Sequence, residues 1–187
     1  MRFYLMPLYR GGAWLAGLAM MAITLLIMLQ VLGRVLDRIL VLFGYDALGL
    51  SISGMSEIAG FLLVGATFLG TAYTFTKGGH IRVTLLTDRI PVRPRALLEV
   101  IMLTIALALT LVLGWQLAAL VLDSHAYDEV SYGMAAVPLM YPQAVLLTGI
   151  ALLTLALLEA WISTLVLAIS NPSRLFPATD PSPRHGD

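Results

Sequence analysis

The chain has 187 residues, of which 59% are hydrophobic and 12% are charged, and its formal net charge is zero. A soluble globular domain is about half apolar and about a quarter charged, so this composition excludes a domain that covers itself with polar groups in water. The zero net charge gives no reason to expect nucleic acid as a partner. The absence of cysteine excludes disulfides, thiolate metal sites and cysteine catalysis.

Four apolar stretches are long enough to cross a bilayer, whose hydrocarbon core of about 30 Å requires about 20 helical residues. Backbone groups inside hydrocarbon must be hydrogen-bonded within their own segment, which favours helices over open strands. The predicted transmembrane helices are 11–34, 54–77, 94–122 and 139–169. We therefore expect an all-α integral membrane domain at 1–170 and a disordered cytoplasmic tail at 171–187, where Pro and Gly are frequent.

The distribution of Lys and Arg predicts the orientation of these helices. Nine of the 11 basic residues lie near the two termini or in the connection 77–95, and only Arg34 and Arg38 lie on the opposite side. Cytoplasmic segments of membrane proteins carry an excess of Lys and Arg. Both termini and the connection 77–95 are therefore predicted to lie in the cytoplasm.

Two connections are predicted to contain short amphipathic segments at the membrane interface. Arg34, Asp37 and Arg38 stand at positions i, i+3 and i+4, so residues 35–50 either extend the first helix outward or form a helix in the interface. The sequence leaves both alternatives open. In the connection 77–95, charged residues alternate with apolar ones, which predicts a short amphipathic helix on the inner surface.

The sequence contains no motif that indicates an enzyme. It lacks a paired-His zinc motif, a G-x-S-x-G nucleophile and a phosphate-binding glycine loop, and its three histidines are far apart in the chain. We therefore expect no enzymatic activity, no cofactor and no metal site.

Two carboxylates, Glu99 and Glu159, lie within predicted helices. Ionisable groups inside a membrane are costly, and they pair, face the bundle interior or serve a function. One interpretation is a proton or ion relay. The favoured one is an ion pair near the cytoplasmic surface, with Lys77, Arg93 or Arg95 as partner, because no polar residue continues a path outward from either carboxylate.

Small side chains form one stripe on each of two helices. The stripes are Gly60, Thr67, Thr71 and Thr74 on the second helix, and Ala106, Thr110, Gly114 and Ala118 on the third. In lipid, such stripes mark close contact between helices, within the bundle or with a partner. The remaining faces consist of large apolar residues, and no polar lumen is apparent. This pattern indicates a membrane scaffold or accessory subunit rather than a pore.

Several motifs occur in a fixed order along the chain. They comprise Gln30 and Arg34 at the end of the first helix, Glu57 opening the second, then Phe68, Leu69, Gly70, Gly78, His80, Ile81 and Val83, and finally Ser131, Pro138, Tyr141 and Pro142. Together they resemble the small membrane subunit of the tripartite ATP-independent periplasmic (TRAP) transporters, the DctQ-like family. One position departs from the family pattern, because Thr84 replaces the usual acidic residue.

The resemblance implies the small permease subunit of a sodium-coupled, binding-protein-dependent secondary transporter that imports organic acids across the bacterial inner membrane. Such a subunit braces a large membrane transport subunit and contributes to docking of a periplasmic substrate-binding protein. The partners are then these two proteins and the lipid bilayer, and not nucleic acid. The partner-interface candidates are Arg34, Glu57, Gly60, Thr67, Gly70, His80, Ile81, Arg82, Leu85 and Pro138. The alternative is a scaffold or assembly subunit of another membrane complex.

Two expectations concern particular candidates. Arg34 and Glu57 reach the same outer level, so they either form an ion pair that fixes the first hairpin or remain two separate solvated charges. On the inner side, the two glycines at 78–79 permit a sharp turn. The segment after them, with Ile81 and Leu85 toward the membrane, is expected to pack against the large subunit.

Overall fold

The computed structural model describes residues 3–46, 49, 54–78 and 91–170 of the chain. Across these residues it has four helices, which are α1 (Met6–Leu42), α2 (Met55–Thr76), α4 (Val92–Ala126) and α5 (Met140–Ser170). Each helix is long and apolar enough to cross a membrane. The prediction of an all-helical protein with four membrane-spanning helices is therefore confirmed for the described part of the chain.

The outer end of α1 decides between the two alternatives for residues 35–50. The helix continues well beyond its predicted end and ends at Leu42, two residues before Gly44, whose φ is +81°. The N–H of Tyr45 donates to the carbonyl of Leu40 at 2.9 Å, and the N–H of Gly44 donates to that of Val41 at 3.1 Å. These two bonds form a Schellman motif. This connection therefore begins as an extension of α1, and its described residues contain no separate interfacial helix.

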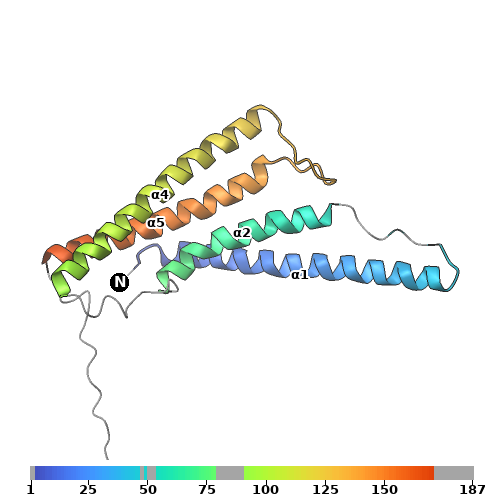
Figure 1. Cartoon of the computed structure of the whole chain (residues 1–187), viewed down its shortest axis with the longest axis horizontal. Helices are drawn as coiled ribbons and strands as arrows, with labels where there is room; N and C mark the ends of the chain where they lie inside the picture. The colour runs from blue at the N-terminus through green and yellow to red at the C-terminus, as the bar shows by residue number, and fades with distance from the viewer. Residues whose placement is uncertain (1–2, 47–48, 50–53, 79–90, 171–187) are drawn as a thin grey trace, which may run out of the picture.

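The four helices form an open array rather than a closed bundle. α1 packs along α2, α2 along α5 and α5 along α4, whereas α1 meets α5 only over a short stretch. Figure 1 shows the two hairpins, α1 with α2 and α4 with α5, inclined to each other with α2 and α5 adjacent. α1 and α4 lie at the two edges of the array and consequently keep long apolar faces exposed. These faces include Trp14 and Met21 on α1 and Leu109 and Trp115 on α4.

Small residues bring the backbones of the helices close together. A Cβ atom on Gly12 of α1 would lie 2.8 Å from the carbonyl oxygen of Leu69, and one on Gly149 of α5 would lie 2.6 Å from the carbonyl carbon of Phe68. The buried alanines Ala16, Ala66, Ala72 and Ala156 continue this contact. Small residues permit such approach in lipid, where burying large apolar side chains gains little.

The predicted orientation can be tested directly, because the chain has no cysteine of its own. Lys77 ends α2, and Met134 lies in the connection between α4 and α5; both side chains are exposed. In intact cells, Lys77→Cys should resist a membrane-impermeant maleimide, whereas Met134→Cys should react with it. Reaction at both positions before lysis would contradict the predicted topology.

Candidate partner interface

The connection between α4 and α5 is an ordered loop, which we call the outer loop (residues 127–139) after its predicted side of the membrane. Val130 and Pro138 form an isolated antiparallel bridge. Ser131 closes the loop further, because its N–H donates to the carbonyl of Val137 at 2.9 Å and its hydroxyl accepts the N–H of Val137 at 3.1 Å. Ser131 and Pro138 therefore stabilise the backbone conformation of this loop.

The outer loop rests on the first turn of α2. Glu57 accepts the N–H of Ala135 at 3.2 Å through Oε2, and the backbone of Gly133 lies directly against the same carboxylate. Gly54, at the start of α2, has φ +90° and lies so close to Ala135 that a Cβ on it would be 2.8 Å from the Ala135 methyl carbon. The contact therefore requires glycine at both positions.

This arrangement replaces the proposed pair between Arg34 and Glu57. The structure describes both residues and contains no hydrogen bond or ion pair between them; Arg34 is exposed on α1. The Glu57 carboxylate is instead occupied by the backbone of the outer loop. Of the two alternatives that the sequence left open, the ion pair between Arg34 and Glu57 is therefore not formed among the described residues.

At the end of the array that is predicted to face the cytoplasm, which we call the inner end, Glu159 of α5 contacts the start of α1. Its Oε1 accepts the N–H of Leu5 at 3.1 Å, one of the donors that a helix N-terminus leaves unpaired. Its Oε2 is buried and has no hydrogen-bond partner among the described residues, and the same holds for the hydroxyl of the fully buried Tyr9. Lys77, one proposed partner of Glu159, lies over the ring of Tyr73 with its Nζ 5.6 Å from the centroid.

The inner end is also packed by aromatic rings. Phe3 meets Tyr9 edge-on with ring centroids 6.3 Å apart, and it meets Phe75 with centroids 6.5 Å apart. This packing joins the start of α1 to the end of α2 around the Glu159 contact. Glu99, the second carboxylate that the sequence singled out, is half-buried on α4, one turn after Arg95.

The two stripes of small residues have different surroundings. The α4 stripe is half-buried and faces α5, with a Cβ on Gly114 placed 3.6 Å from Ile150 Cγ2. On α2, Gly60 has open space around it and Thr67 is exposed, with its hydroxyl bonded to the carbonyl of Leu63 at 2.8 Å. Gly70 instead faces Ala16 of α1. The α2 stripe is therefore largely free of contacts within the described chain.

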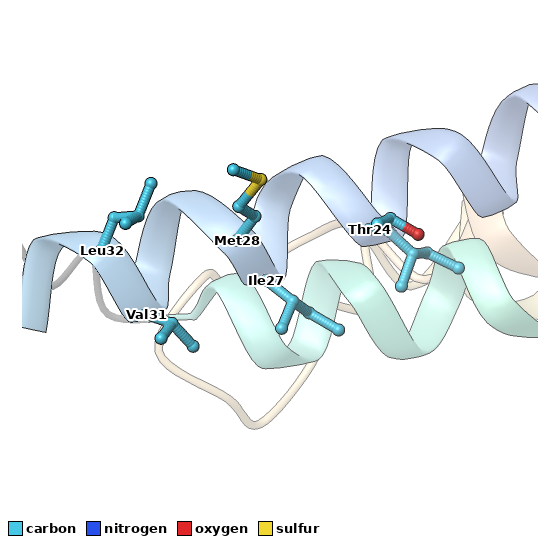
Figure 2. A pocket seen from close by; sticks show the side chains of 6 residues that line it. Thr24, Ile27, Met28, Val31 and Leu32 are labelled. Carbon is cyan, nitrogen blue, oxygen red and sulfur yellow. The ribbon is translucent and has the colours of Figure 1, made fainter.

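A shallow apolar hollow lies on the outer half of α1, and Figure 2 shows five of its side chains labelled along the helix. It is lined by Ile23, Thr24, Ile27, Met28, Val31 and Leu32. Thr24 adds little polarity, because its hydroxyl donates to the carbonyl of Met20 at 2.9 Å. Sequence reasoning missed this hollow because a run of apolar residues carries no motif.

Four of the predicted interface residues lie outside the described part of the chain. They are His80, Ile81, Arg82 and Leu85, together with most of the predicted inner amphipathic segment. Among the residues that are described, no group of three His, Cys, Asp or Glu side chains could hold a metal ion.

The chain is similar in sequence to one family of known proteins. Residues 23–167 match the family described as "Tripartite ATP-independent periplasmic transporters, DctQ component". No curated protein and no solved structure matches the chain. The matched region runs from α1 to α5, and it includes the outer loop, both small-residue stripes and the hollow on α1.

Proposed function

The chain belongs to the DctQ component family of the tripartite ATP-independent periplasmic transporters, and from this we propose that it braces the large transport subunit of a sodium-coupled importer of organic acids. In this proposal it lies in the bacterial inner membrane with both termini in the cytoplasm. The large subunit carries substrate and sodium. A periplasmic substrate-binding protein delivers the organic acid to the outer face of the complex.

The open array is the observation that supports this role best. α1 and α4 each pack along one neighbouring helix, and they leave apolar faces that suit lipid or a large apolar partner. Ionisable groups inside membranes usually line a substrate or ion path. In the described helices the two internal carboxylates, Glu99 and Glu159, both lie toward the end where α1 begins and α5 ends. Two carboxylates at one end do not form a polar path across the described helices. The proposal therefore assigns the path for substrate and ions to the large transport subunit.

The outer loop supports the proposed contribution to docking of the binding protein. It is held by backbone hydrogen bonds and by Glu57, and it exposes Tyr127, Tyr132 and Met134. Aromatic side chains are frequent anchors of protein interfaces, and a preformed loop loses little entropy on binding. These three side chains are the proposed contact points for the binding protein.

The test of the role as a subunit is purification of the tagged chain in mild detergent from its native membrane. Recovery of a large multi-helix transport protein in fixed stoichiometry is the expected result. Recovery of an unrelated membrane complex instead would favour the alternative of a scaffold or assembly subunit, and it would overturn the proposal.

The exposed α2 stripe gives a sharper prediction about where the large subunit packs. In the double variant Gly60→Leu and Thr67→Leu, bulk would enter a surface that the described chain leaves open. Overpacking costs about 1–3 kcal/mol per site, so co-purification of the large subunit should fall by about tenfold or more. The thermal stability of the chain alone should stay the same or rise, because leucine favours a helix interior over glycine.

The matched control for this variant is Thr148→Leu. Thr148 is also exposed, and its hydroxyl donates to the carbonyl of Ala144 at 2.8 Å, but it lies on α5 outside the stripe. This control should keep the large subunit. Equal recovery from the double variant and the control would exclude the α2 stripe as an interface.

A further inference from the structure

Two carboxylates connect the hairpins of this chain at opposite ends. The first hairpin consists of α1 and α2, and the second of α4 and α5. Glu57 of the first hairpin accepts a backbone N–H from Ala135 of the second. Glu159 of the second hairpin accepts a backbone N–H from Leu5, immediately before the first. We call these the outer contact and the inner contact.

The spacing along the helices allows one contact at each surface of a membrane. Glu57 lies in the first turn of α2, which ends at Thr76, and Glu159 lies in the second half of α5, which runs from Met140 to Ser170. At about 1.5 Å per residue, each of these helical stretches spans about 30 Å. This is about the thickness of the hydrocarbon core. Neither contact therefore needs to form at mid-membrane, where an isolated charge is costly.

Between the two contacts the hairpins meet along one narrow surface. α2 and α5 touch through glycines, with Gly149 on the backbone of Phe68 and a Cβ on Gly65 placed 3.0 Å from Val145 Cγ1. Such a surface permits close approach of the two backbones, and a hydrogen bond at each of its ends adds a constraint on rotation of one hairpin relative to the other. α1 contacts the second hairpin only over a short stretch of α5, where a Cβ on Gly12 would lie 3.1 Å from Leu152 Cδ1.

We propose that Glu57 and Glu159 are positioning residues that fix the angle between the two hairpins, one at each membrane surface. Each carboxylate accepts a hydrogen bond from the backbone, so the contact constrains the partner main chain rather than a mobile side chain. Each also lies at the positive end of a helix dipole, Glu57 at the start of α2 and Glu159 at the start of α1. Charge-assisted bonds of this kind are stronger than neutral ones.

The surroundings of the outer contact show that the fold is adapted to it. Gly133 leaves space that any side chain would take from the Glu57 carboxylate, and Gly54 does the same for Ala135. Ala136, next to the bonded amide, has φ +43°, a conformation that residues other than glycine seldom adopt. The outer loop thus holds a locally unfavourable backbone in the position that presents the Ala135 N–H to Glu57.

The test measures distances between the hairpins in the full chain, reconstituted in nanodiscs. Spin labels on Leu42→Cys and Leu122→Cys report on the outer ends of α1 and α4, and labels on Leu8→Cys and Leu97→Cys report on the inner ends; all four side chains are exposed. We expect Glu57→Ala to broaden the outer distance distribution. We expect Glu159→Ala to broaden the inner one.

Amide hydrogen exchange supplies a second, local readout. Loss of a bond to a charged acceptor should speed exchange at the Ala135 amide by about tenfold or more in Glu57→Ala, and at the Leu5 amide in Glu159→Ala. If an alanine variant is not recovered folded, the glutamine variant decides. Faster exchange in Glu57→Gln or Glu159→Gln would support the proposal, and exchange unchanged from wild type would overturn it.

Two matched controls separate positioning from a general loss of charge or of buried polar groups. Glu129 is acidic and belongs to the outer loop, but its Oε2 accepts the Ser124 hydroxyl at 2.7 Å within the same hairpin. Tyr9 is fully buried beside the inner contact with an unpartnered hydroxyl. Glu129→Ala and Tyr9→Phe should leave both distance distributions narrow. Distributions in Glu57→Ala and Glu159→Ala that match these controls would overturn the proposal.

Discussion

Proteoliposomes that contain this chain as their only membrane protein are expected to take up no organic anion, with or without a sodium gradient. Co-reconstitution with the large subunit and addition of the binding protein should produce uptake that depends on sodium. The measurement is accumulation of a radiolabelled carboxylate under an inward sodium gradient. Uptake should require all three proteins, so the expected change is from background to full transport.

The physical reason lies in the surfaces of the described helices. A carboxylate that crosses a bilayer needs a path of polar partners, because an unpaired charge in hydrocarbon costs several kcal/mol. Along α4, the outer half exposes large apolar residues such as Leu109, Val112 and Trp115. Its hydroxyls at Thr104 and Thr110 donate to backbone carbonyls of the same helix, which leaves little for a substrate to bind.

The reconstitution also distinguishes the proposed function from the inference about the two hairpins. Uptake by the chain alone would overturn the role of a bracing subunit but would leave the contacts of Glu57 and Glu159 untouched. Normal three-component uptake with Glu57→Ala, combined with unchanged hairpin distances, would remove the positioning role and leave the proposed function standing.

The helices could be predicted from the sequence because their cause is local. A run of about 20 apolar residues has one stable form in hydrocarbon, so number and type of the elements follow from composition. The ends of the helices depend on details that hydropathy does not report. α1 continues past Arg34, Asp37 and Arg38 because charged residues are compatible with helix in water, and it ends at Leu42, two residues before Gly44, which adopts a positive φ.

The contacts of Glu57 could not be predicted, because the partner is a backbone amide 78 positions away in the chain. A backbone N–H is present at nearly every residue and has no sequence signature. Reasoning from side-chain charge therefore offered a pair with Arg34, a basic residue at the same level, as one of two alternatives. The signal that could have indicated the loop was the pair of glycines, Gly54 and Gly133, at positions where no helix requires them.

The sequence also could not show which face of small residues on α2 packs within the chain and which face stays exposed. α2 presents Gly65, Ala66 and Ala72 on one face and Gly60 with Thr67 on another, and both faces have helical spacing. Periodicity identifies each face but not its neighbour. The first packs within the chain, and the second remains exposed, because the approach of α1 and α5 to α2 depends on all three helices together.

The substitution Gly149→Ala is expected to lower the thermal stability of the chain. The new Cβ would lie 2.6 Å from the carbonyl carbon of Phe68, 2.7 Å from its Cβ and 2.9 Å from its carbonyl oxygen. Two of these are backbone atoms, so no side-chain rotation can relieve the overlap and α2 must move away from α5. Overpacking of this kind costs about 1–3 kcal/mol.

The matched control is Gly17→Ala, since Gly17 is an exposed helical glycine of α1 with no atom near the position of a Cβ. Alanine in a helix interior is favoured over glycine by about 0.5–1 kcal/mol, so this variant should be as stable as wild type or more stable. Thermal unfolding in one detergent measures both. Because the intrinsic preference for alanine acts equally in the two variants, the difference between them isolates the cost of separating α2 from α5. Equal melting temperatures for the two variants would show that the hairpins can separate at no cost, and that the close packing at Gly149 does not hold them together.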